Sequence, residues 1–133
     1  MYSEIELIGN LSTEPELRYT PAGNAVCHFN MATNREWEDK KETTWYRISV
    51  WGKSGEACAQ WLHKGRQVFV KGRLVCDPAT GGPRVYQKSD GTWAASFEIS
   101  AATVKFLGGK NGNVETEVDA GTAEQVDTKD IPF

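Results

Sequence analysis

Ser54-Gly55-Glu56-Ala57-Cys58-Ala59-Gln60-Trp61-Leu62-His63-Lys64-Gly65 is the segment on which the predicted architecture of this chain depends. Ser54 is a suitable N-cap and Glu56 suits a first helical turn. His63 and Lys64 suit a last turn, and Gly65 can end a helix in the left-handed conformation. The segment therefore predicts one helix, in a chain whose other regular segments resemble strands.

Five apolar or alternating runs flank this helix and predict strands. Three precede it, at residues 5–11, 26–33 and 44–51, and two follow it, at residues 67–75 and 93–107. In the second run Cys27, Phe29 and Met31 alternate with polar or small residues, which indicates a half-buried strand. Three strands, a helix and two strands is the order of an OB-fold barrel. We therefore predict an all-β, five-stranded OB-fold barrel with one helix between strands 3 and 4.

The connections carry turn signals. Thr20-Pro21-Ala22-Gly23-Asn24 predicts a turn, and Asp90-Gly91-Thr92 predicts a hairpin turn. The charged segment 34–43 is expected to be a loop, and the last strand is expected to break near Ala101-Ala102. We assign four phenylalanines to the core, with Phe69 as a possible border of a binding site: Phe29, Phe69, Phe97 and Phe106.

The strand predicted over residues 44–51 has two contrasting faces, because side chains alternate along a strand. One face is apolar and holds Tyr46, Ile48 and Val50, and the other holds Trp45, Arg47, Ser49 and Trp51. Six residues at roughly 3.4 Å each place the two tryptophans about 20 Å apart, a span that successive bases of an extended strand can follow. Aromatic rings stack on any base, and Arg47 can contact phosphate or stack by cation–π attraction. The alternative is that Trp45 and Trp51 cover a second core or a subunit interface.

Other aromatic residues also lie in polar surroundings. Trp37 lies among charged residues, Tyr86 lies near two basic groups, and Trp93 follows the predicted hairpin turn. Trp61 is a possible further stacking residue, as is Trp93, although Trp61 is better explained by packing of the helix onto the barrel. The basic residues that interleave with these aromatics are candidates for phosphate or backbone contacts: Arg18, Arg35, Arg47, Lys53, Lys64, Arg66, Lys71, Arg73, Arg84 and Lys88.

The C-terminal segment has a different composition. From Gly108 onward it is mostly small, polar and acidic, and such a composition cannot bury enough apolar surface to order the chain. We therefore predict a folded domain over residues 1–107, a flexible linker over 108–126 and an acidic tip over 127–133, the last two forming a disordered tail. An apolar anchor beside carboxylates on a free end is typical of a docking peptide. The tip residues are Asp127, Asp130, Ile131, Pro132 and Phe133.

Charge and cysteine content narrow the function classes. Residues 1–107 hold 13 Lys/Arg and 12 Asp/Glu, a balance of +1, whereas residues 108–133 hold 2 and 6, a balance of -4. The acidic average therefore does not exclude a polyanionic ligand. The chain has an odd number of widely spaced cysteines, namely Cys27, Cys58 and Cys76. This pattern favours reduced thiols in a cytosolic protein. No secretion signal, membrane span, metal-ligand cluster or nucleophile–base pair is visible, so we expect no enzyme, metal, cofactor or membrane partner.

Several short segments together resemble bacterial single-stranded DNA-binding proteins. They are Glu14-Pro15-Glu16-Leu17-Arg18-Tyr19, Pro21-Ala22-Gly23-Asn24-Ala25-Val26, Thr44-Trp45-Tyr46-Arg47, Trp51-Gly52-Lys53, Val70-Lys71-Gly72-Arg73-Leu74 and the terminal Asp130-Ile131-Pro132-Phe133. The resemblance implies that Trp37, Trp45, Trp51 and Tyr86 stack on DNA bases. It also implies a homotetramer and a tip that recruits replication and repair proteins. The chain departs from the family pattern in its short linker, in Lys129 within the tip and in a longer connection at residues 76–83.

The function expected from the sequence is sequence-independent coating and protection of single-stranded DNA in replication, recombination and repair. Such a protein would be cytoplasmic and associated with the nucleoid. Two alternatives belong to other classes: a primosome-like OB adaptor whose aromatic face binds mainly protein, and a cold-shock-like RNA-binding module. The residues by themselves do not separate DNA from RNA.

Overall fold

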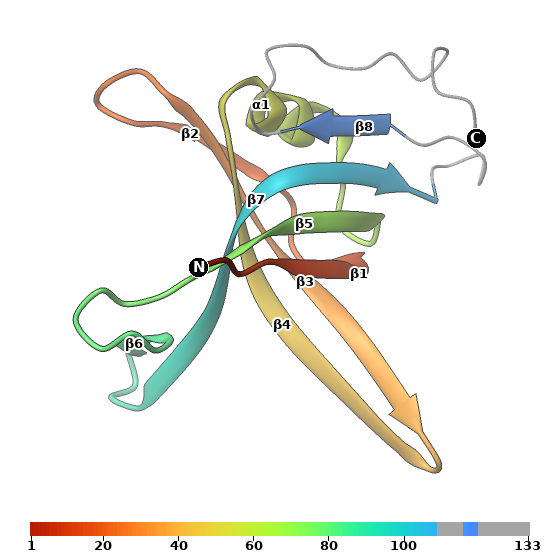
Figure 1. Ribbon diagram of the computed structural model, residues 1–133, viewed down its shortest axis with the longest axis vertical. Coiled ribbons are helices and arrows are strands. Elements are labelled where there is room, and N and C mark those ends of the chain that lie inside the picture. The colour runs from red at the N-terminus through yellow and green to blue at the C-terminus, as the bar shows by residue number, and fades with distance from the viewer. Residues whose placement is uncertain (109–115, 120–133) are drawn as a thin grey trace.

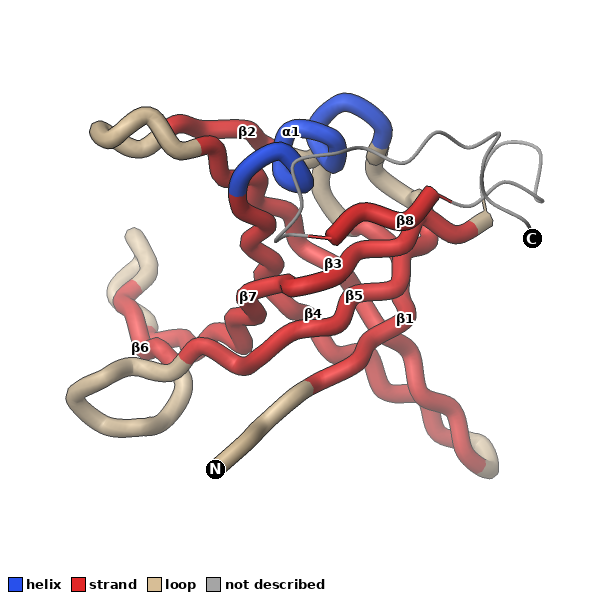
Figure 2. Tube along the Cα trace, turned by 45° about the horizontal axis from the view of Figure 1, so that its top comes forward, coloured by secondary structure: helices blue, strands red, loops and turns tan. Residues whose placement is uncertain are grey.

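The computed structural model describes residues 1–108 and 116–119, and Figure 1 shows their arrangement. In chain order the elements are β1 (Ile5–Leu11), β2 (Glu16–Tyr19), β3 (Ala25–Trp37), β4 (Lys40–Trp51), α1 (Gly52–Trp61), β5 (Gln67–Val75), β6 (Arg84–Gln87), β7 (Trp93–Leu107) and β8 (Thr116–Asp119). Strands dominate the fold, and α1 lies at one end of it (Figure 2). Among the described residues, no helix is long and apolar enough to span a membrane.

Five of the strands close into a barrel. The order β1-β5-β7-β4-β3 is completed by pairing of β1 with β3, and only the β4–β7 pair within this ring is parallel. The helix α1 connects β4 to β5, which are the third and fourth barrel strands in chain order. The predicted OB-fold is therefore confirmed, together with the position of its helix.

The core follows the strand alternation expected from the sequence. Ile48 and Val50 of β4 are fully buried and Tyr46 packs against the core, whereas Trp45 and Trp51 are exposed. The largest fully buried side chains on the other elements are Phe29, Phe106, Met31, Leu62, Ile99, Val68, Val70, Val104 and Cys27.

Two of the four phenylalanines assigned to the core occupy it. Phe29 and Phe106 are buried, and Phe69 is partly buried. The assignment of Phe97 to the core is wrong, since this side chain is 51% exposed. It lies opposite Tyr46 of β4, next to Ser96, where the pairing of β7 with β6 ends, and its ring lies 5.9 Å from that of Tyr46 between centroids.

Two glycines allow the barrel strands to approach closely. A Cβ atom on Gly9, which precedes the residues of β1 that pair with β3, would lie 2.2 Å from the Ala32 carbonyl oxygen. A Cβ atom on Gly72 would lie 2.1 Å from the Ser100 carbonyl oxygen. The β5–β7 register shifts between Lys71 and Gly72, so that Ala102 has no partner. The predicted break in the last strand is therefore wrong: β7 is continuous, and the irregularity is a bulge.

The loop predicted over residues 34–43 is wrong. β3 continues to Trp37 and β4 begins at Lys40, so this segment is a two-stranded hairpin that projects from the barrel (Figure 1). Apart from Trp37 its side chains are polar on both faces, so there is no alternation to detect. The pairing rests on the backbone ladder and on a hydrogen bond of 2.8 Å from the Thr43 hydroxyl to the Asn34 side chain.

The helix is confirmed in place, but its predicted ends are wrong. It begins at Gly52, its N-cap is Trp51 without a side-chain bond, and Ser54 is buried inside it. It ends at Trp61, so His63 and Lys64 follow it rather than forming its last turn. Gly65 has the predicted positive φ, +91°, but in the turn after the helix. The Thr20–Asn24 and Lys88–Thr92 turns are confirmed by their backbone hydrogen bonds.

The predicted C-terminal tail lies largely outside the described residues. Within the expected linker, Thr116–Asp119 forms the short strand β8, which pairs antiparallel with β7. The rest of that linker from residue 109 and the whole tip, residues 127–133, are not described.

Candidate nucleic-acid interface

The outer face of β4 carries two exposed tryptophans on either side of an exposed arginine. Trp45 is 59% exposed, Trp51 is 43% exposed, and Arg47 lies between them on the same face. Residues directly opposite each other in paired strands point to the same face of a sheet. Asn30 of β3 and Glu98 of β7 therefore flank Arg47 on this surface.

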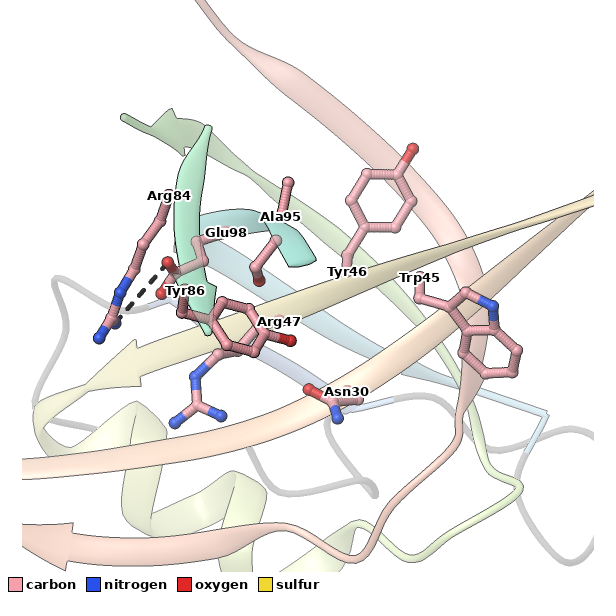
Figure 3. A pocket seen from close by; sticks show the side chains of 9 residues that line it. Asn30, Trp45, Tyr46, Arg47, Arg84, Tyr86, Ala95 and Glu98 are labelled. Carbon is pink, nitrogen blue, oxygen red and sulfur yellow. Dashed lines mark ion pairs between the residues drawn. The ribbon is translucent and has the colours of Figure 1, made fainter. Parts of the chain in front are cut away.

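The β6–β7 hairpin extends this surface. Along β7, Ala94, Ser96 and Glu98 alternate onto one face, and Tyr86 and Arg84 of β6 lie opposite Ala94 and Ser96. Figure 3 shows the Tyr86 ring close to the Arg47 side chain, although the two belong to different strands. Between them and Trp45 is a hollow of about 500 Å³. Its lining residues are Asn30, Trp45, Tyr46, Arg47, Arg84, Tyr86, Ala95, Ser96 and Glu98.

The same register adds basic residues at both ends of the surface. Arg18 of β2 lies opposite Val26, which in turn lies opposite Trp51. Arg73 of β5 lies opposite Ser100 of β7, which lies opposite Ser49 of β4. We call the outward residues on this surface the aromatic face: Arg18, His28, Asn30, Trp45, Arg47, Ser49, Trp51, Arg73, Arg84, Tyr86 and Glu98.

The positive charges of the aromatic face differ in how far they are neutralised. Arg18 pairs with Glu16 at 2.5 Å, and this hydrogen bond and charge lower the pKa of the Glu16 carboxyl. Arg84 lies 3.9 Å from Glu98. Within the part of the chain that the structure describes, Arg47 has no ion-pair partner. The same holds for Arg73 among those residues, so the charges of Arg47 and Arg73 are the ones most available to a phosphate.

Trp37 and Arg35 lie apart from the aromatic face. Both are near the tip of the β3–β4 hairpin, and strand alternation places them on the face opposite Trp45. The Arg35 guanidinium lies 5.0 Å from the centre of the Trp37 ring, in cation–π contact, and Trp37 is 37% exposed. The hairpin thus carries a second aromatic–basic pair at a distance from the barrel.

Four candidate residues lie at the helix end of the barrel: Lys53, Trp61, Lys64 and Arg66. Trp61 is 46% exposed, so the interpretation that it packs the helix onto the barrel is wrong; Ala57, Cys58 and Leu62 do this instead. The Arg66 guanidinium lies 5.9 Å from the Phe106 ring and donates a hydrogen bond to the Trp61 carbonyl. Burial lowers the pKa of Arg66, and its side chain is committed to the protein.

The remaining candidates are dispersed. Lys71 forms an ion pair with Glu4 at 3.0 Å on the β1 side of the barrel. Lys88 lies in the β6–β7 turn, and Trp93 is 69% exposed at the start of β7. Strand alternation puts Trp93 on the face opposite Tyr86. The tip residues lie outside the described part of the chain.

The aromatic face also contains residues that the sequence reasoning did not select. They are His28, Asn30 and Glu98, whereas Ser49 was placed on this face but not named as a contact. The Ser49 hydroxyl is hydrogen-bonded to His28 Nδ1 at 3.0 Å. The alternation of buried Cys27, Phe29 and Met31 points the residues between them outward, so the signal for His28 and Asn30 was present. Glu98 follows only from the parallel β4–β7 pairing, which a single sequence does not reveal.

A closed OB-fold barrel with solvent-exposed tryptophans and arginines on one sheet face defines a class of protein. It is that of the nucleic-acid-binding OB domains, which stack bases on aromatic platforms along a basic surface. Comparison with known sequences refines this class. Residues 2–107 match the model of the single-strand binding protein family.

Similar proteins include a single-stranded DNA-binding protein of Neisseria meningitidis serogroup A and single-stranded DNA-binding protein 2 of Clostridium acetobutylicum. The first is 37% identical over 116 residues, which cover 84% of this chain and 63% of that protein. The second is 40% identical over 136 residues, which cover 96% of each. The chain belongs to the single-strand binding protein family, and it spans less than two thirds of the length of the Neisseria relative.

Proposed function

We propose that this protein binds single-stranded DNA without sequence preference and coats and protects it during replication, recombination and repair. The observation that carries the proposal is the exposure of Trp45 and Trp51 on either side of Arg47. Exposed aromatic side chains that gather on one sheet face, unlike single ones, are typical of a ligand or partner site. Every base has a face that stacks on an indole ring, so such a surface tolerates any sequence.

Binding of this kind involves no chemical step. The stacking residues hold the bases and the basic residues neutralise the phosphates, with release of counterions. Stacking on aromatic rings and charge pairing with phosphates involve no base edge, so we expect binding without sequence preference. We accordingly expect a binding protein rather than an enzyme, acting in the cytoplasm on the nucleoid.

The DNA-binding proposal is tested by anisotropy with labelled oligo-dT, oligo-rU and a duplex of equal length. We expect oligo-dT to bind most tightly and the duplex least. The affinity for oligo-dT should fall steeply as salt rises. A plot of the logarithm of the binding constant against the logarithm of the salt concentration should have a slope of about -0.7 per neutralised phosphate. Preference for oligo-rU would favour the cold-shock-like alternative. Weak binding of all three would favour the protein-binding adaptor and contradict the proposal.

The proposal includes a homotetramer. Ile8 of β1 lies opposite Phe69 of β5 on the outer surface of the barrel, and Ile8 is 56% exposed. An apolar pair on the β1–β5 surface, away from Trp45 and Trp51, supports subunit packing there with the aromatic face left free. Sedimentation velocity at micromolar concentration should give a tetramer mass, and Ile8→Glu should lower it. A monomer mass for the parent protein would contradict this part.

The tip is proposed to recruit replication and repair proteins. Its support is the sequence: Phe133 offers an aromatic ring and a terminal carboxylate, next to Asp130. Deleting residues 127–133 should leave oligo-dT affinity unchanged or slightly higher at low salt, because this segment has a side-chain charge balance of -1 and competes only weakly with phosphate for basic groups. Recovery of host replication and repair proteins in a pull-down should fall sharply. Phe133→Ala should reproduce most of that loss, and equal recovery by all three chains would contradict the proposal.

A further inference from the structure

His28 occupies a central place on the aromatic face. It lies on β3 directly opposite Ser49, between the rows that contain Trp51 and Arg47. Its neighbours along β3, Cys27 and Phe29, point into the core, so the imidazole points outward and is partly exposed. Ser49 lies midway between Arg47 and Trp51 on β4. A DNA strand that stacks on both Trp45 and Trp51 must therefore pass over the His28–Ser49 pair.

The ring of His28 is held in one orientation. The Ser49 hydroxyl and His28 Nδ1 are 3.0 Å apart, and a hydroxyl can either donate to a neutral ring nitrogen or accept from a protonated one. The contact therefore survives in both charge states of the imidazole. It occupies Nδ1 and leaves Nε2 as the ring atom for a ligand, as a donor to a phosphate or base oxygen.

The charges around His28 favour a neutral ring in the free protein. The charged groups that face it are Glu16 and Arg18 on β2, Arg47 on β4 and Glu98 on β7. Burial lowers its pKa most, followed by the charges of Arg47 and Arg18. Glu16 is already paired with Arg18, so the positive charge of Arg47 is the least compensated.

A bound phosphate would reverse this balance. It would neutralise Arg47 and place a negative charge near the imidazole, and both changes favour the protonated ring. We propose that His28, oriented by Ser49, is a further single-stranded DNA contact that takes up a proton when the strand binds. This inference rests on the proposed DNA binding. It adds His28 to the residues that contact DNA and links binding to the uptake of one proton.

The direction in which DNA affinity changes with pH depends on the His28 pKa in the free protein and in the complex. If the imidazole binds its proton more tightly in the complex than in the free protein, the complex carries more protons at pH values between the two pKa values. Affinity then rises as pH falls through that window and becomes constant below it. With a free pKa below the ordinary 6.5, we expect oligo-dT affinity to rise about three- to tenfold from pH 8 to pH 6. Oligo-dT is suitable because thymine does not titrate in this range.

The test compares three proteins by oligo-dT titration at fixed salt from pH 8 to pH 6. They are the parent, His28→Gln and His63→Gln. His63 is the other of the two histidines in the chain and lies in the segment after α1, beside Glu14. We expect His28→Gln to bind about two- to threefold more weakly than the parent at pH 8 and to lose most of the pH dependence, whereas His63→Gln keeps the parent's affinity and profile.

A second measurement needs no variant. The His28 imidazole resonances in the full-length protein, titrated with and without saturating oligo-dT, should show a higher pKa in the complex. A parent-like slope in folded His28→Gln, or an unchanged or lowered His28 pKa on binding, would overturn the inference and leave the proposed DNA binding intact. Failure of the parent to bind oligo-dT at pH 8 would instead overturn the proposed function, and the inference with it.

Discussion

The Arg84 guanidinium on β6 lies 3.9 Å from the Glu98 carboxylate on β7, and Glu98 is also the register partner of Arg47 on β4. One carboxylate thus lies between two arginines on the aromatic face. It places a negative charge where phosphates are expected. The surface is therefore less positive than its arginines alone suggest.

Replacing this carboxylate should strengthen DNA binding. We expect Glu98→Gln to raise oligo-dT affinity about two- to fivefold at low salt, with a smaller gain at high salt, because it removes a repulsive charge next to Arg47. Glu56→Gln is the matched control, since it makes the same charge change on the exposed surface of α1. Equal effects of the two substitutions would show that only net charge matters.

The two tryptophans of β4 should each contribute strongly to affinity. Stacking is worth roughly 1–3 kcal/mol per base on substitution by alanine, so Trp45→Ala and Trp51→Ala should each weaken oligo-dT binding by about one to two decades. Trp61→Ala removes a similarly exposed indole from α1 and should change the affinity by less than about threefold. Circular dichroism establishes that each variant is folded. Parent-like binding by both folded β4 variants would refute the assignment.

Close strand packing at Gly9 gives a prediction about stability. A Cβ atom there would lie 2.2 Å from the backbone oxygen of Ala32, so Gly9→Ala should lower the free energy of unfolding by about 2 kcal/mol or more. At Gly82 the nearest atom is the Thr80 hydroxyl at 3.7 Å, and Gly82→Ala should stay within about 0.5 kcal/mol of the parent. Urea denaturation measures both. Similar losses in the two variants would contradict the close approach.

The three cysteines should differ sharply in reactivity. Burial raises the pKa of Cys27 to about 12 and that of Cys58 well above its ordinary value, whereas Cys76 is exposed. The thiolate is the reactive form, so an aromatic disulfide reagent at pH 8 should modify one thiol rapidly and the other two only after denaturation. Cys76→Ser should abolish the rapid phase. Rapid reaction of two or three thiols in the native protein would contradict this burial.

Much of the barrel was predictable because its strands alternate. On β4 the order Tyr46, Ile48, Val50 against Trp45, Arg47, Trp51 identified both the buried and the exposed side before any pairing was known. The same reasoning failed at residues 34–43, where polar side chains on both faces of a hairpin leave no hydrophobic pattern. It also failed at Phe97, because the apolar side of β7 runs beyond the barrel and into solvent.

The composition of the site depended on pairing between strands far apart in sequence. Tyr86 and Arg47 line one hollow because β6 and β4 both pair with β7, and Glu98 of β7 lines it too. The structure places Trp37 elsewhere, at the tip of the projecting hairpin. Residue types thus indicated the chemistry, but the register determined which of them share one surface.

The central claim is that the exposed tryptophans stack on the bases of single-stranded DNA. Its most direct test is the intrinsic tryptophan emission of the protein during titration with oligo-dT and with a duplex of equal length. We predict strong quenching by oligo-dT, far less by the duplex, and loss of most of the oligo-dT quenching in a Trp45→Ala/Trp51→Ala double variant. Binding of oligo-dT without quenching, or equal quenching by the duplex, would contradict the account.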